Sequence, residues 1–533
     1  MRLAAEQTRY AGKNGAPLAR KRLWLIAGFA IISLATFVRT YKLDIRPLHQ
    51  DEAVNGFFLM RLLNTGVYQY DPANFHGPSL YYFGLISSSL FGLKTTAIRL
   101  VPAVFGVGTV LLTLMLRRRI GRLGALFAAL LITVSPGAVY MSRYFIHESL
   151  FVFAALATVV AALWYYDSGK PLYLMLASVA FGLMGATKET AVISAVVLAL
   201  ALVLATLYMS MKQRLDMRRS LTRVTDPESV AGDDAIESWG AAFERLGGKS
   251  RVALSLIGGS GLFIIVLVLF FSSFLSNPRW TQDIFRSFQL WAHTGNSEHT
   301  HEAYMYAWWL TQEEAPVFAL GLMGAGLAFW RARRRFPIFA ALWACGLLAA
   351  YSLIPYKTPW LTLNFIVPLA LLSGYAVSRF NEGATTKSRA LRFAFAGFAV
   401  VIGLSQMIAL NFVHFDDDRY PYVYAHTHRD FNRLTDDIAR ISHLTGPGES
   451  GAIAVTAPEY WPLPWYLRDY PGVAYYGKAI TNREPIVVCA ESQEEELQPM
   501  LGKSYERVDS YTLRPGVNLV LYALRRDGYD FHE

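Results

Sequence analysis

Long apolar runs separated by short polar or basic segments dominate the chain. The runs lie near residues 23–41, 98–116, 123–141, 149–166, 171–187, 190–210, 252–275, 315–330, 337–354, 359–378 and 391–411. Most of them approach the roughly 20 apolar residues that a helix needs to cross the hydrocarbon core of a bilayer. We therefore predict a mainly α fold, a polytopic bundle of about eleven transmembrane helices.

Basic clusters between the apolar runs predict how the chain is oriented in the membrane. Four connecting segments are rich in Lys and Arg: Arg117–Arg122, Lys212–Arg223, Arg331–Arg335 and Lys387–Arg392. All four fall on the cytoplasmic side if the N-terminus is cytoplasmic and if the short run 79–93 does not cross. We expect that run to be an interfacial or re-entrant helix on the outer face. Residues 1–22 then form a cytoplasmic tail, and 23–411 form the transmembrane domain.

The pattern of the sequence changes after residue 411. Asp430–His443 has the spacing of an amphipathic helix, and Ser492–Gln498 predicts a short helix that ends at Pro499. Three apolar runs are typical of buried strands: Gly451–Thr456, Ile486–Cys489 and Leu519–Leu524. Because an odd number of spans places this tail outside, we expect 412–533 to form an extracytoplasmic α/β domain.

Composition supports a membrane protein. Hydrophobic residues make up 53% of the 533 residues. The net charge is +10, but the Lys and Arg residues lie in the clusters that set membrane orientation, which argues against nucleic-acid binding. The basic stretch Arg20–Arg22 before the first apolar run predicts an uncleaved anchor. The two cysteines, Cys345 and Cys489, lie far apart, so no disulfide framework or thiolate metal site follows.

Charged residues gather at the predicted outer ends of the spans, and Asp51 and Glu52 form their acidic centre. Ionisable groups near hydrocarbon are costly, and they usually face a shared interior and pair with one another. A plainer interpretation stays open, in which Asp51 caps a short interfacial helix and Glu52 is its first-turn charge. Likewise Arg143 and Lys188 could be interfacial anchors.

Carboxylates, cations and aromatic rings at an outer membrane face suit the transfer of a sugar from a polyprenyl-phosphate donor. Candidate catalytic carboxylates are Asp51, Glu52 and Glu148, with Asp51 as the general base that accepts the acceptor's proton. Candidate cations for the donor phosphate are Arg143, Lys188 and Lys357. Candidate substrate-binding residues are His76, Tyr81, Tyr82, Tyr356 and Trp360.

A metal site is a further hypothesis. Asp51, Glu148 and His147 are candidate ligands for Mg²⁺ or Mn²⁺, with zinc as an option if histidine binds. The alternative pairs the carboxylates with Arg143 and Lys188 and needs no metal. The residues alone leave both open.

The order of these motifs resembles the GT-C membrane glycosyltransferases, in particular the protein mannosyltransferase and aminoarabinose transferase group. The motifs are the first outer loop with Asp51-Glu, then His-Gly-Pro-Ser-Leu-Tyr-Tyr at 76–82 and Ala-Ile-Arg-Leu-Val-Pro at 97–102. The chain looks most like a prokaryotic family named for its association with flippase activity. It shares Asp51-Glu-Ala, Tyr356-Lys-Thr-Pro-Trp and Asp416-Asp-Asp-Arg-Tyr-Pro with that family.

The resemblance implies that Asp51 takes the place of the catalytic acidic residue in the first outer loop, and Glu148 that of the acidic residue after the third span. It implies an inverting glycosyltransferase in a prokaryotic plasma membrane, whose partners are a polyprenyl-phosphate sugar, membrane lipid and a glycan, lipid or protein acceptor. Two other functions stay open. One is a non-enzymatic flippase for lipid-linked sugars, or an accessory to one, and the other is a scaffold whose outer tail recruits a partner.

Overall fold

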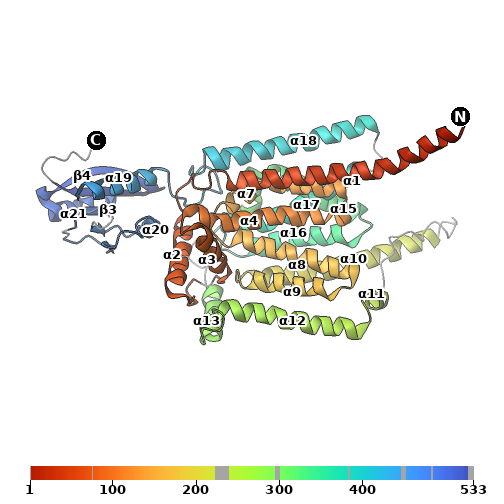
Figure 1. Ribbon diagram of the computed structural model, residues 1–533, viewed down its shortest axis with the longest axis horizontal. Coiled ribbons are helices and arrows are strands. Elements are labelled where there is room, and N and C mark those ends of the chain that lie inside the picture. The colour runs from red at the N-terminus through yellow and green to blue at the C-terminus, as the bar shows by residue number, and fades with distance from the viewer. Residues whose placement is uncertain are drawn as a thin grey trace.

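The computed structural model describes residues 2–74, 76–221, 239–293, 300–381, 385–445, 452–481 and 484–525. Long helices run side by side and form one bundle, as Figure 1 shows. They are α1 (Arg2–Thr40), α4 (Thr95–Met115), α6 (Arg122–Val134), α7 (Pro136–Ser142), α8 (Glu148–Ser168), α9 (Pro171–Gly185), α10 (Ala191–Leu221), α12 (Lys249–Phe271), α15 (Ala315–Arg331), α16 (Arg335–Leu353), α17 (Leu363–Asn381) and α18 (Thr386–Ile408).

Every predicted membrane segment is helical, but not every helix has the length of a span. Eight helices of the described chain are long and apolar enough to cross a bilayer, and the bent pair α6–α7 makes a ninth. The two others, α9 and α15, are apolar but shorter. The prediction of a polytopic helix bundle is therefore confirmed.

The segment 123–141 is not the straight helix that its apolar pattern suggested. It breaks at Ser135, and the axes of α6 and α7 differ by 61°. Pro136 has no backbone N–H, and the Ser135 side chain instead accepts a hydrogen bond from Ala138 N and starts α7 afresh. The break lets α7 turn toward α18.

Helix α17 lies at the centre of the bundle, with α6 and α15 packed closely on it. A Cβ on Gly124 of α6 would lie 2.5 Å from the Gly374 carbonyl oxygen of α17. Only glycine permits that approach, because any side chain would overlap the neighbouring backbone. The sequence pattern of small residues thus brings these helices nearly into backbone contact.

Shorter helices connect the long ones. They are α2 (Gln50–Thr65), α3 (Ser79–Phe91), α5 (Arg117–Ile120), α11 (Trp239–Arg245), α13 (Trp280–His293) and α14 (Met305–Glu313). Figure 1 shows α2, α3 and α13 gathered at one end of the bundle, with α2 running across it. Helix α3 has 13 residues, too few to span a bilayer.

The chain after residue 414 forms a five-stranded sheet beyond that same end (Figure 1). The strands are β1 (Ile453–Val455), β2 (Val473–Tyr475), β3 (Ile486–Ala490), β4 (Tyr505–Arg514) and β5 (Val517–Leu524), in the order β2-β1-β3-β5-β4. Strand β1 pairs parallel with β2 and β3, whereas β5 pairs antiparallel with β3 and β4.

Two helices cover the two faces of the sheet. Side chains of β3 alternate, so that Ile486 and Val488 pack under α19 (Asp430–Thr445) while Val487 and Cys489 pack under α21 (Glu494–Leu501). The expectation that Pro499 ends the second helix was wrong. That helix continues to Leu501, and Pro499 lies inside its last turn.

The sheet region contacts the helix bundle through α20 (Leu463–Tyr466). The buried indole of Trp465 rests on α2, where a Cβ on Gly56 would lie 2.6 Å from its ring. Arg468 donates to the Leu93 carbonyl oxygen at 3.2 Å. These tryptophan and arginine side chains therefore attach the sheet region to α2 and to the loop that follows α3.

Candidate active site

The sequence around Asp51 starts helix α2. His49 is the N-cap, and its Nδ1 accepts a hydrogen bond of 3.0 Å from Asp51 N. Glu52 Oε2 accepts from His49 N at 3.1 Å, which completes a capping box. Asp51 is thus not the cap, and its own carboxylate stays available at the helix N-terminus, where the helix dipole favours negative charge.

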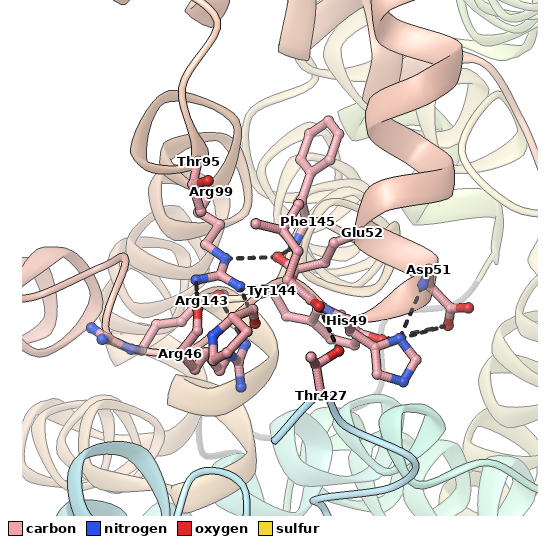
Figure 2. A network of polar contacts seen from close by, with 12 residues as sticks. Arg46, His49, Asp51, Glu52, Thr95, Arg99, Arg143, Tyr144, Phe145 and Thr427 are labelled. Carbon is pink, nitrogen blue, oxygen red and sulfur yellow. Dashed lines mark hydrogen bonds and ion pairs between the residues drawn. The ribbon is translucent and has the colours of Figure 1, made fainter. Parts of the chain in front are cut away.

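The two adjacent carboxylates have opposite surroundings (Figure 2). Glu52 is fully buried, and Arg99 Nε and Nη2 donate to its two oxygens at 2.7 and 2.6 Å. Phe145 N donates to Oε1 at 2.8 Å. Burial alone would raise the pKa of Glu52, but the Arg99 charge and hydrogen bonds hold that pKa below its usual value. Glu52 therefore stays ionised and joins α2 to α4.

Asp51 points the other way, and its side chain is 40% exposed. Its Oδ2 lies 3.7 Å from His49 Nδ1 and accepts a hydrogen bond of 3.4 Å from the Tyr144 hydroxyl. Both contacts are made by Oδ2, and the Asp51 side chain borders an open space.

That space is a cavity of about 370 Å³ at the end of the bundle where α2 lies. Seven of the residues predicted from the sequence line it: Asp51, His76, His147, Glu148, Lys188, Tyr356 and Trp360. They come from five separate connections between helices, and the fold brings them together.

A buried ion pair forms one wall of the cavity. Lys188 Nζ lies 2.5 Å from Glu148 Oε1, and both side chains are almost fully buried. Burial would lower the pKa of Lys188, but Glu148 and Glu189 outweigh it and raise that pKa above its usual value. Lys188 therefore carries a positive charge at any physiological pH.

A second acid–histidine pair lies beside it. His76 Nδ1 is 2.9 Å from Glu189 Oε2, and the rings of His76 and His147 are 4.9 Å apart. Burial would raise the pKa of Glu189, but the charges of His76 and Lys188 lower it below its usual value. Tyr356 interacts electrostatically with Asp51, Glu148, Lys188 and Glu189, and burial raises its pKa to about 12, so its hydroxyl stays a proton donor.

The remaining predicted residues do not line this cavity. Arg143 donates to three carbonyl oxygens at the end of α1, those of Val38, Tyr41 and Lys42. Lys357 Nζ donates to the His301 and Ile354 carbonyl oxygens at 3.0 and 2.6 Å.

The two predicted tyrosines, Tyr81 and Tyr82, lie outside the cavity lining. Tyr81 is buried, and its hydroxyl donates to Asn55 Oδ1 at 3.0 Å and accepts from Asn74 Nδ2 at 2.8 Å. The Tyr82 hydroxyl bonds to Ser273 Oγ at 2.7 Å. Tyr81 thus supports two residues that do line the cavity, Asn55 and Asn74.

The site residues predicted from the sequence did not include several that line the cavity: Asn55, Asn74, Glu189, Thr190, Trp291 and Tyr351. Asn55 follows Asp51 by four residues on α2, a spacing that places both on one helix face and could have indicated it. Glu189 directly follows Lys188. Trp291 and Tyr351 carry no such signal, because only the packing of α13 and α16 brings them to the cavity.

The predicted metal ligands do not form a metal site. Across the described ranges, no group of three or more His, Cys, Asp or Glu is arranged to hold a metal ion. Glu148 is engaged by Lys188, and His147 Nε2 contacts the Gly77 carbonyl oxygen at 3.2 Å. Glu148 therefore takes part in the alternative of paired charges through Lys188, whereas Arg143 contacts backbone carbonyl oxygens instead of a carboxylate.

A second, mostly apolar cavity of about 300 Å³ adjoins the first. It lies between α9, α10, α12 and α13, and its lining is dominated by aromatic and aliphatic side chains such as Phe181, Phe263 and Leu267. Lys188 and Glu189 line both cavities. The cavity beside Asp51, which we call the polar chamber, and the apolar chamber between α9, α10, α12 and α13 thus share one cationic side chain, Lys188.

Comparison with known proteins gives a match for part of the sequence and for the whole fold. Residues 75–218 match the model of the dolichyl-phosphate-mannose-protein mannosyltransferase family. No curated protein sequence matches the chain.

Solved structures match over nearly the full length. ArnT from Cupriavidus metallidurans in the apo state has a TM-score of 0.63 and 15% identity, over 95% of this chain and 98% of that one. ArnT bound to undecaprenyl phosphate has a TM-score of 0.62 and 15% identity over the same shares. The archaeal oligosaccharyltransferase AglB from Archaeoglobus fulgidus, in complex with an inhibitory peptide and a dolichol-phosphate, has a TM-score of 0.53 and 14% identity, over 96% of this chain and 75% of that one.

A structure of the same Archaeoglobus fulgidus oligosaccharyltransferase in complex with Zn and sulfate matches with a TM-score of 0.50 and 14% identity, over 92% of this chain and 73% of that one. The predicted resemblance is confirmed at the level of the fold. The chain is a multi-span membrane protein with the GT-C glycosyltransferase fold of the protein mannosyltransferase and ArnT type.

Proposed function

We propose that the protein transfers a sugar from a polyprenyl-phosphate donor to an acceptor at the outer membrane face, with inversion at the sugar. The observation that carries this proposal is the cavity in which a half-exposed Asp51 and the Lys188–Glu148 pair share one chamber. A general base and a phosphate-binding cation are the two groups that such a transfer needs. The solved GT-C structures with undecaprenyl phosphate or dolichol-phosphate support this class of donor.

The two adjoining cavities suggest how the donor lies. The apolar chamber between α9, α10, α12 and α13 would take the first prenyl units, and the polar chamber would take the sugar. The phosphate would then lie where the chambers meet, at Lys188, whose ammonium donates hydrogen bonds to phosphate oxygens. His76 lies at the same junction through its contact with Glu189.

The chemistry is a single displacement. Asp51 accepts the proton of the acceptor hydroxyl, the acceptor oxygen bonds to the anomeric carbon, and the bond between that carbon and the phosphate oxygen breaks. The polyprenyl phosphate leaves with the electron pair, and Lys188 stabilises its growing negative charge. Tyr356, which stays protonated, would donate a hydrogen bond to the sugar or the phosphate.

We further propose the topology that this chemistry requires. Residues 1–22 are cytoplasmic, 23–411 form the transmembrane domain, and 412–533 form an extracytoplasmic domain of a prokaryotic plasma-membrane protein. The side-by-side position of α2 and the sheet region in Figure 1 supports placing both on one face.

A transfer assay tests the proposal. Membranes with the wild-type chain should move label from polyprenyl-phosphate sugars to an endogenous acceptor, and Asp51→Asn should lower the rate by roughly 10²–10⁴-fold. Donor binding should stay near the wild-type value, since Asn keeps the shape of the side chain. The control is Asp44→Asn, which removes an exposed carboxylate from the preceding loop and should have no effect. If the Asp51→Asn protein transfers sugar at the wild-type rate, Asp51 is not the general base, and Glu148 becomes the next candidate.

Transport of a lipid-linked sugar is the second candidate function. A specific observation favours it: Glu314 is buried at the broken pair α6–α7, where Ser135 Oγ and Gly137 N donate to its Oε1 at 2.7 Å. Broken helices beside buried ionisable groups are a feature of transporters. If the wild-type chain transfers no sugar and Glu314→Gln blocks lipid translocation, the transporter function is correct and the transferase function is not.

A further inference from the structure

A third cavity, of about 240 Å³, is lined by residues from α5, from the α15–α16 turn and from the end of α17, away from α2 and the sheet. Five arginines line it: Arg118, Arg119, Arg333, Arg334 and Arg379. They come from three segments far apart in the sequence, namely α5, the turn between α15 and α16, and the last turn of α17. The glycosyltransferase chemistry at Asp51 uses none of them.

Close packing fixes these three segments against one another. Gly121, which starts α6, has φ +83°, and any Cβ there would meet Ser378 Oγ of α17. Arg334 Nη1 donates to the Arg118 carbonyl oxygen at 3.2 Å, which joins the α15–α16 turn to α5. Packing therefore holds these three segments together, and their arginine side chains supply much of the lining.

The lining has a strong excess of positive charge. The lining contains no Asp or Glu among the described residues. Asp167, outside the lining, pairs with Arg119, and Arg379 Nε donates to the Tyr375 hydroxyl. Guanidinium groups that converge on one small space repel each other, and an anion placed between them relieves that repulsion. Arginine also offers pairs of parallel N–H donors, the geometry that phosphate oxygens accept.

Tryptophans mark the depth of this cavity in the membrane. The guanidinium of Arg117 lies 4.8 Å from the Trp24 ring centroid, and that of Arg331 lies 4.7 Å from the centroid of the exposed Trp330 ring. Tryptophan side chains favour the level of the lipid head groups. The cavity therefore faces the phosphates of that leaflet, and basic pockets between membrane helices at this level bind acidic head groups.

We propose that these five arginines form a binding site for a phosphate group, supplied by an anionic phospholipid of the leaflet opposite Asp51. The same chemistry would accept soluble phosphate, so the test must separate the two sources. The proposal is independent of the reaction at Asp51, because the two sites lie at opposite ends of the bundle.

The experiment uses the full-length protein, stripped of lipid in a neutral detergent. It is titrated with phosphatidylglycerol, with phosphatidylcholine and with inorganic phosphate at matched ionic strength, and binding is measured from the shift in unfolding temperature. The pocket variant is Arg118→Gln with Arg333→Gln, two exposed arginines of the lining. The control is Arg117→Gln with Arg331→Gln, which removes the same charge from the same segments outside the lining.

We expect phosphatidylglycerol to bind the wild type and the control, and to bind the pocket variant roughly 30-fold more weakly. Each single variant, Arg118→Gln or Arg333→Gln, should bind phosphatidylglycerol roughly fivefold more weakly than the wild type. These single variants keep the proposal testable if the double variant fails to fold. Saturable binding of inorganic phosphate with the same dependence on Arg118 and Arg333 would confirm the phosphate site and identify soluble phosphate as a ligand. Equal weakening in the pocket and control variants, or no binding of either phosphate probe, would overturn the proposal.

Discussion

At the scale of single residues, burial and partners divide the charged groups into two kinds. Glu52 and Arg143 are surrounded by hydrogen-bonding partners. Arg99 donates to the Glu52 carboxylate, and Arg143 donates to carbonyl oxygens at the end of α1. Asp51 and Lys188 face the cavity. A buried charge whose hydrogen bonds are all made has none left for a substrate, and removing its partner would destabilise the fold.

Lys188 should govern donor affinity. Changing Lys188 to Met together with Glu148→Gln removes the ammonium without leaving a buried carboxylate unpaired. We expect donor binding to weaken by roughly 10–100-fold, the value of a charged hydrogen bond, with acceptor affinity unchanged. Equilibrium binding of a fluorescent polyprenyl phosphate measures this, and Glu148→Gln alone is the control. A loss of acceptor affinity with normal donor binding would contradict the role of Lys188.

At the scale of elements, helix α2 is clamped from the far end of the chain. The Thr427 hydroxyl donates to the Leu48 carbonyl oxygen at 2.7 Å, and Leu48 N donates to the Tyr466 hydroxyl at 2.9 Å. Figure 2 shows Thr427 below His49, the N-cap of α2. The chain after the last long helix therefore positions Leu48, just before the turn that starts α2.

Loosening that clamp should slow transfer without unfolding the protein. Thr427→Val with Tyr466→Phe removes both hydrogen bonds and keeps the side-chain volumes. We expect the transfer rate at saturating donor to fall roughly 10–100-fold, since a small displacement of a base is costly, while donor affinity stays normal. The matched control is Thr435→Val with Tyr505→Phe, whose hydroxyls bond within the sheet region. An unchanged rate would show that the clamp does not position Asp51.

The start of α15 should make stability depend on pH. Burial raises the pKa of Glu314 to about 8 and that of Glu313 to about 7. At a pH between the ordinary carboxyl pKa and these raised values, the two carboxyl groups are protonated in the folded state but ionised in the unfolded state. The free energy of unfolding therefore falls as pH rises from about 5 to 8. Thermal unfolding in detergent should show this decline, and Glu314→Gln should reduce it, whereas the exposed Glu302→Gln should not. An equal decline in the Glu314→Gln protein would place the effect elsewhere.

At the scale of the whole molecule, opposite ends of the bundle differ in charge and in architecture. Acids, histidines and the sheet region lie at one end, and the arginine-lined cavity lies at the other. This polarity is what the positive-inside rule requires of a protein with a cytoplasmic N-terminus.

Cysteine labelling checks that orientation. In a background with Cys345 and Cys489 replaced by Ser, we expect Asp469→Cys to react with a membrane-impermeant maleimide in sealed cells. Arg118→Cys should react only after the membrane is opened. Both positions are exposed in the structure, so accessibility does not bias the comparison. Labelling of position 118 from outside would reverse the topology and place the site in the cytoplasm.

The sequence by itself determined the helix bundle and the sheet's main strands. Apolar runs form helices in a membrane because each backbone group must be hydrogen-bonded within its own segment. The strands β1, β3 and β5 were predicted because they are continuous apolar runs, while β2 is three half-buried residues and β4 alternates, and both were missed. Asp51, His76, Glu148 and Lys188 were found because charge at a span end is costly without a purpose. Their roles in catalysis stay predictions.

Only the tertiary structure decided which of these charges share a space. Asp51 and Glu52 are neighbours in the sequence, but the capping box turns Glu52 toward Arg99, and Asp51 then points into the cavity. Tyr351 and Trp291 reach the same cavity from distant helices. A span-end position specifies depth in the membrane but not direction around the helix axis. That direction is set by packing, which involves residues hundreds of positions apart.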